Sequence, residues 1–162
     1  MMKRHDRSRF SIYLLLVSVL VATWGCGGGR EDQWTQARPP VYPVSGQVLS
    51  NGEPVAQATV MFQPVSEGGK PGFATTDGRG NFRAQTFETG DGLTEGTHRV
   101  AIHKTHMVDQ SGNIVEEVMD DGIGLTEKNL LPEIYADFAT SGIEVTVEAV
   151  RSNQLEPFDL SQ

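Results

Sequence analysis

The chain has 162 residues, of which 38% are hydrophobic, with 18 Gly, 8 Pro and one Cys. This length predicts one domain, and the composition excludes a collagen-like or fully disordered chain, because Gly has no three-residue period and apolar residues are too many. A single Cys excludes a disulfide-stapled miniprotein, and a formal net charge of -8 argues against a nucleic-acid partner.

The first 25 residues are predicted to be an export signal. An apolar run of eleven residues spans 12–22 and is broken only by Ser18. A run of that length is too short to cross a bilayer core, which needs about 20 residues, but it fits the core of a secretory signal. Four cations precede the run and hold the N-terminus on the cytoplasmic side: Lys3, Arg4, Arg7 and Arg9.

The only cysteine of the chain comes directly after this apolar run. Thr23-Trp24-Gly25-Cys26 resembles the lipobox of bacterial lipoproteins, in which a small residue precedes a cysteine that is acylated and becomes the first residue. Gly25 and Cys26 match that pattern, whereas Trp24 stands where a small residue is usual. The resemblance implies lipidation at Cys26, where acyl chains bind a membrane with about 0.8 kcal/mol per buried CH₂. The alternative is an ordinary cleaved signal that leaves a free thiol.

Lipidation implies an exported protein on the periplasmic or surface face of a membrane. Removal of residues 1–25 takes away four cations and one anion, which leaves 9 basic and 20 acidic side chains and a net charge of -11. That charge favours solubility and repels phosphate backbones. Residues 26–42 contain three consecutive glycines and the pair Pro39-Pro40, which indicate a flexible tether.

Residues 43–162 have the pattern of an all-β domain. Short β-branched and alternating runs are separated by turn signals such as Asn51-Gly52 and Asp77-Gly78-Arg79-Gly80. In the clearest run, Ile143, Val145, Val147 and Ala149 are predicted to face inward. About seven strands at this spacing indicate a sandwich or a barrel. The predicted strands are 44–49, 59–65, 73–76, 82–86, 97–104, 143–150 and 155–160.

The order of several short motifs is similar to that of the carboxypeptidase regulatory-like family, small Greek-key sandwiches related in shape to transthyretin and frequent in bacterial lipoproteins. The resemblance covers 43–162 and implies a Greek-key β-sandwich fold. The motifs are Val44-Ser45-Gly46, Gly52 with Pro54, Ala58-Thr59-Val60 with Phe62, Thr76-Asp77 with Gly80 and Phe82, Gly96 with Val100 and Ile102, Leu131-Pro132 with Tyr135, Thr140-Ser141-Gly142, and Phe158-Asp159-Leu160.

No catalytic residue and no cofactor are predicted. No serine lies in a Gly-x-Ser-x-Gly elbow, and a hydrolase of the related fold carries a Tyr-Arg-Gly-Ser tail, where this chain ends Phe158-Asp159-Leu160-Ser161-Gln162. His98 stands where the family usually has a tyrosine, and we expect a structural role. A zinc site of His98, His103 and His106 would need all three to converge, which strand alternation opposes.

The least template-like segment is 106–129, which is expected to be a long loop. Its acidic residues are weak candidates for calcium binding, because a calcium loop needs oxygens at closely alternating positions; they are Glu116, Glu117, Asp120 and Asp121. The other interpretation is a solvated charged loop. Asp77 with Asn81 is a weaker candidate, since Asp77 is expected to cap its own turn.

These features predict a non-catalytic, lipid-anchored β-sandwich that serves as a binding, accessory or envelope-structural module, with the membrane as one partner. The alternative is a calcium-dependent carbohydrate- or protein-binding module that uses residues 106–129. A cryptic hydrolase is a third hypothesis, which requires the three histidines to converge. Recognition is expected first at 106–129 and 91–95, and the nearby aromatic residues are Tyr135 and Phe138.

Overall fold

A computed structural model describes residues 38–115 and 124–161. Cys26 and the predicted signal lie outside the described residues, as do the four acidic candidates for calcium binding at 116–121. In the described part of the chain, no helix has both the length and the apolar character needed to cross a membrane.

Nearly all regular secondary structure in the described chain is short strands, which confirms the predicted all-β class. Each predicted strand region contains at least one strand, and additional strands of two to four residues raise the count beyond seven. The only helical element in the described ranges is the four-residue 3-10 helix η2 (Glu133–Ala136). The strands are β1 (Val41–Tyr42), β2 (Val44–Ser50), β3 (Glu53–Pro54), β4 (Thr59–Pro64), β5 (Gly72–Thr75), β6 (Asn81–Arg83), β7 (Leu93–Thr94), β8 (Gly96–His103), β9 (Thr105–Val108), β10 (Thr126–Asn129), β11 (Ile143–Val147), β12 (Asn153–Gln154) and β13 (Phe158–Asp159).

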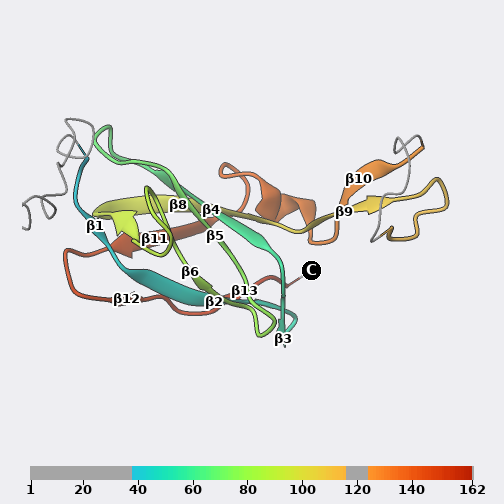
Figure 1. Ribbon diagram of the computed structural model, residues 1–162, viewed down its shortest axis with the longest axis horizontal. Helices are drawn as coiled ribbons and strands as arrows, with labels where there is room; N and C mark the ends of the chain where they lie inside the picture. Colours follow the sequence, from blue (N-terminus) through green and yellow to red (C-terminus); the bar gives the residue numbers. More distant parts are fainter. Residues whose placement is uncertain (1–37, 116–123, 162) are drawn as a thin grey trace, which may run out of the picture. The chain divides into compact units, whose positions relative to one another are not determined.

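Two sheets form the sandwich (Figure 1). The first is antiparallel, in the order β11-β8-β4-β5. The second is built around β2, which pairs in parallel with β12 and β13 and antiparallel with β3 and β6. Two small sheets, β1-β7 and β9-β10, complete the described structure.

The core lies between these sheets and is centred on three phenylalanines. Phe82 of β6 packs against Phe62 of β4, with 6.0 Å between ring centroids, and against Phe158 of β13, with 5.8 Å. Gly46 of β2 makes room for this ring, because a Cβ there would lie 2.6 Å from Phe82 Cζ. Strand alternation supplies much of the rest of the core, including Val100 and Ile102 of β8, which are fully buried.

The two C-terminal strands are shorter than the sequence pattern predicts. The run predicted for 143–150 ends at Val147, and Ala149 is exposed instead of facing inward. The physical reason is that the Asn153 side chain takes the next backbone groups, those of Glu148. The run predicted for 155–160 is interrupted at Pro157, which has no N–H to donate to a ladder.

The segment predicted as a long loop, 106–129, contains a β-hairpin in its described part. β9 pairs with β10 from Thr105↔Asn129 to Val108↔Thr126. On its way out the chain also turns back at Asp109, so that Val108 forms a bridge with Ile114. The described part of this segment is therefore not a loop throughout, because local turn chemistry and a strand pairing order its two ends.

Candidate functional site

The two sheets are joined along one side by the hairpin of β5 and β6. Phe73 and Gln85 exchange two backbone hydrogen bonds of 2.9 Å, and Asp77 N–H donates to the Asn81 carbonyl at 2.8 Å. Between these two pairs, no backbone pairing in the described residues joins Thr75 of β5 to β6. A groove of about 580 Å³, the β5–β6 groove, opens there. It is lined by Ser45, Gly46, Phe73, Thr75, Asp77, Asn81, Phe82, Arg83, Gln85, Thr89 and Gln154.

This groove combines one aromatic face with hydroxyl and amide groups. The Phe73 side chain is 47% exposed. The Ser45 hydroxyl donates to Gln154 Oε1 at 2.9 Å, which ties β2 to β12 across the groove wall. An apolar ring beside side-chain amides suits a hydroxyl-rich ligand, and the lining also includes the charged residues Asp77 and Arg83. Phe73 was not among the predicted site residues, although its alternation with buried Ala74 places it on the outer face.

On the opposite side of the sandwich, no ladder between described strands joins the two sheets. A second groove of about 560 Å³, the β11 groove, lies there. One end is closed by the Asn153 amide, which accepts from Glu148 N–H at 2.9 Å and donates to the Glu148 carbonyl at 3.1 Å. Near the other end, the Tyr135 hydroxyl donates to the Ser161 carbonyl at 3.1 Å. The groove is lined by Tyr135, Gly142, Ile143, Glu144, Val145, Thr146, Leu155, Glu156, Pro157, Phe158 and Asp159.

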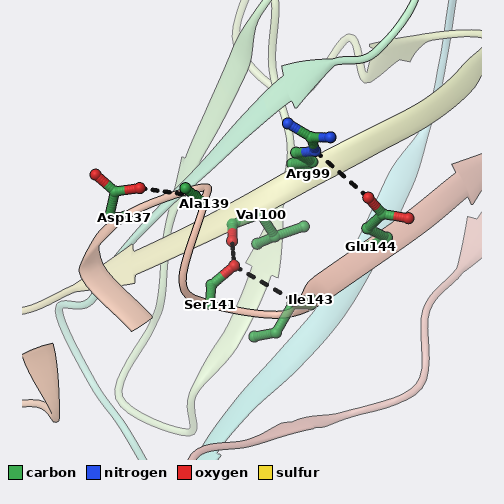
Figure 2. A network of polar contacts seen from close by, with 7 residues as sticks. All are labelled: Arg99, Val100, Asp137, Ala139, Ser141, Ile143 and Glu144. Carbon is green, nitrogen blue, oxygen red and sulfur yellow. Dashed lines mark hydrogen bonds and ion pairs between the residues drawn. The ribbon is translucent and has the colours of Figure 1, made fainter. Parts of the chain in front are cut away.

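Ser141 sets the start of β11 and so the position of this second groove (Figure 2). Its buried hydroxyl donates to the Val100 carbonyl and accepts from Ile143 N–H at 3.3 Å. Asp137 holds the preceding turn by accepting from Ala139 N–H at 2.6 Å. The Thr140-Ser141-Gly142 motif is therefore a connection from η2 to β11, and its serine hydroxyl is occupied by the backbone.

The imidazole of His98 is fully buried on β8. Its Nδ1 lies 3.1 Å from the Gly96 carbonyl oxygen, which can only accept, so this nitrogen carries the proton. Its Nε2 then accepts from the Thr94 hydroxyl at 3.4 Å. Burial lowers the pKa of His98 below its usual 6.5, and the bond to Gly96 opposes that shift. This environment fits the expected structural role.

The buried neutral state of His98 predicts a loss of stability in mild acid. Because its folded pKa is lowered, the unfolded chain binds the proton more readily, so the free energy of unfolding falls as the pH decreases below 6.5. One proton contributes at most about 1.4 kcal/mol per pH unit to that slope. We expect His98→Gln to flatten the slope measured by urea unfolding between pH 7 and pH 5. An unchanged slope in His98→Gln would contradict the assignment.

Three aspartates that could have served as ligands are occupied by backbone N–H groups. Asp77 Oδ1 accepts from Arg79 N–H at 2.8 Å and from Asn81 N–H at 2.9 Å, so Asp77 caps its turn as expected. These bonds, the one from Arg79 first, lower the pKa of Asp77. Asp109 forms the same turn with Ser111 and Asn113. Asp91, in the expected recognition segment 91–95, accepts from three consecutive N–H groups, those of residues 86–88.

Within the described ranges, no group of three or more His, Cys, Asp or Glu side chains could hold a metal ion. The structure therefore does not bring His98, His103 and His106 together. Tyr135 packs against the core and forms one end of the β11 groove, while Phe138 is partly buried.

Comparisons with known proteins give no family for this chain. No family model and no curated protein matches it. Among solved structures, a 9R-lipoxygenase from a Cyanothece strain gives a TM-score of 0.38 at 11% identity, covering 76% of this chain and 17% of that one. A chlorocatechol 1,2-dioxygenase from Pseudomonas putida gives 0.34 at 16% identity, covering 75% of this chain and 60% of the other. This chain spans less than two thirds of either protein, and TM-scores of this size carry no argument about activity.

Proposed function

We propose that this protein is a non-catalytic lipoprotein of the cell envelope, anchored by an acylated Cys26 and presenting a β-sandwich that resembles carboxypeptidase regulatory-like domains. The proposal is carried by Cys26 itself, the only cysteine of the chain, which follows the apolar run and Gly25. Three of the side chains considered for chemistry, those of His98, Asp77 and Asp91, form structural hydrogen bonds. In the folded domain, the β5–β6 groove and the β11 groove are the candidate ligand-binding sites.

Replacing Cys26 with alanine tests the anchor. We expect the wild-type chain to fractionate with membranes, to incorporate a labelled fatty acid and to show the mass of added acyl chains. In Cys26→Ala the fatty-acid label should fall to background, because no other thiol is present to accept the chain. Trp24→Ala, which moves the motif closer to a lipobox, is the matched control and should keep the label. An unmodified thiol on a freely secreted wild-type product would refute the anchor.

The alternative function is a calcium-dependent carbohydrate- or protein-binding module. The β5–β6 groove favours carbohydrate, because exposed Phe73 lies among amide and hydroxyl groups. The calcium part depends on Glu116, Glu117, Asp120 and Asp121 and stays a prediction. A calcium titration of the full chain tests that part: a rise in melting temperature that Asp120→Asn with Asp121→Asn abolishes supports it, and an unchanged melting temperature removes it.

A further inference from the structure

The β11 groove lies between two strand edges that have no ladder partner in the described structure. β11 ends its sheet and pairs only with β8. On the far side, β12 and β13 pair only with β2. An unpaired strand edge presents a row of N–H and C=O groups to which another extended chain can add.

The pairing register shows which backbone groups of β11 face the groove. Val65 N–H donates to the Thr97 carbonyl at 2.9 Å, so the odd-numbered residues of β8 direct their backbone groups toward β4. The even-numbered residues of β8 then face β11 and bond to Ile143, Val145 and Val147. Because the bonding side alternates along a strand, Glu144, Thr146 and Glu148 direct their N–H and C=O groups away from β8.

Glu148, just after β11, shows that backbone groups directed away from β8 can form hydrogen bonds. Both of its backbone groups bond to the Asn153 side chain, which replaces a neighbouring strand at that end of the groove. No equivalent bond reaches the outward backbone groups of Glu144 and Thr146 in the described residues. The open stretch therefore offers two positions of an antiparallel ladder, enough for an added segment of about five residues.

The side chains around this open stretch define which segment would fit. Half-buried Ile143, Val145 and Leu155 form an apolar floor. Glu144, Glu156 and Asp159 are also among the lining residues, which include no Lys or Arg. Glu144 forms an exposed ion pair with Arg99 from outside the groove, 3.4 Å between Nε and Oε1 (Figure 2), and Asp159 accepts from Gly52 N–H at 3.2 Å, so a basic side chain would share these carboxylates. An added strand places alternate side chains on opposite faces, so apolar side chains would meet the floor while basic ones would meet the carboxylates. A second copy of this chain would bring acidic edge against acidic edge.

We infer that the β11 groove binds an extended segment of a partner protein, with basic and aliphatic residues in alternation, by strand addition to β11. The inference names a partner for the folded body and does not depend on acylation of Cys26.

The peptide acetyl-Lys-Val-Lys-Val-Lys-Val-amide is the probe, titrated into the full chain in detergent micelles by isothermal calorimetry at low salt. We expect saturable binding that weakens as salt rises, and loss of binding for the Glu-Val analogue. Two further peptides carry N-methyl groups on all Lys or on all Val. Only one of these should lose affinity, by about tenfold, since alternate N–H groups face β11. Equal binding of both N-methyl peptides, or no binding of the probe, would overturn the inference.

A double variant locates the site. Glu144→Gln with Glu156→Gln should weaken binding of the probe by about tenfold at low salt. The matched control, Glu53→Gln with Glu67→Gln, makes the same charge change at exposed positions outside the groove and should bind as the wild type does. Equal weakening in both would show an effect of net charge alone and reject the site. If the protein proves to be a dimer that the peptide dissociates, the β11 edge binds a second copy of this chain instead of a partner protein. Cys26→Ala, which lacks the acylation site, should bind the probe as the wild type does. This keeps the test of the groove separate from the test of the anchor.

Discussion

Phe82→Ala is expected to lower the free energy of unfolding by about 4 kcal/mol, within the usual range for deleting a buried phenylalanine. The Phe82 ring is 3% exposed and contacts the rings of Phe62 and Phe158, so its removal leaves a cavity between the two sheets. Gly46 lies against the same ring and has no side chain that could fill the space. Urea unfolding of the full chain, followed by far-ultraviolet circular dichroism, measures the loss.

Phe73→Ala is the matched control for this prediction. It removes the same atoms from the neighbouring strand of the hairpin, but the Phe73 ring is 47% exposed, so the expected loss of unfolding free energy is below about 1 kcal/mol. Equal losses in the two variants would contradict the assignment of Phe82 to the centre of the core.

Gly80→Ala is expected to cost about 3 kcal/mol of unfolding free energy. Gly80 has a φ of 75°, which an L-residue adopts at a cost of roughly 1–2 kcal/mol. An added Cβ would also lie 2.5 Å from the Val48 carbonyl oxygen, and the bond from Val48 N–H to the Gly80 carbonyl prevents the two segments from separating. This overpacking adds a further cost of about 1–3 kcal/mol.

The chain contains its own control for that substitution. Gly112 occupies the same position of the same five-residue turn, here from Asp109 to Asn113. Its φ is 84°, but nothing lies within 4 Å of a Cβ built there. Gly112→Ala should therefore cost only the backbone term, about 1 kcal/mol. Denaturation midpoints of the two variants give the comparison, and a cost for Gly112→Ala as large as that for Gly80→Ala would refute the role of the Val48 contact.

Local patterns predicted the strands because they depend on neighbouring residues. The run 97–104 predicted β8, and Asp77 was expected to cap its turn. Thr76 was noted only as a family motif. The structure supplies its reason, since its buried hydroxyl donates to the Val55 carbonyl at 2.7 Å and accepts from Ala58 N–H at 2.8 Å.

The candidate grooves could not be predicted in the same way. No signal in the sequence indicated that Asn153 would bond to Glu148. The two ends of 106–129 pair with each other, although polar residues dominate there. Phe73 did carry a signal, its phase of alternation, which marks it as an outward aromatic residue.

The sequence by itself determined the all-β class, because the period-two alternation of side chains and the residues that favour tight turns act over a few positions. It also placed the apolar run and Cys26 ahead of the sandwich. Only the tertiary structure decided which strand edges stay open. That outcome depends on pairings between distant segments, such as β8 with β11 and β2 with the C-terminal strands, whose partners lie 45 and 109 residues apart. A strand carries the same alternation whether its edge is covered or open, so the grooves appear only after the sheets have assembled.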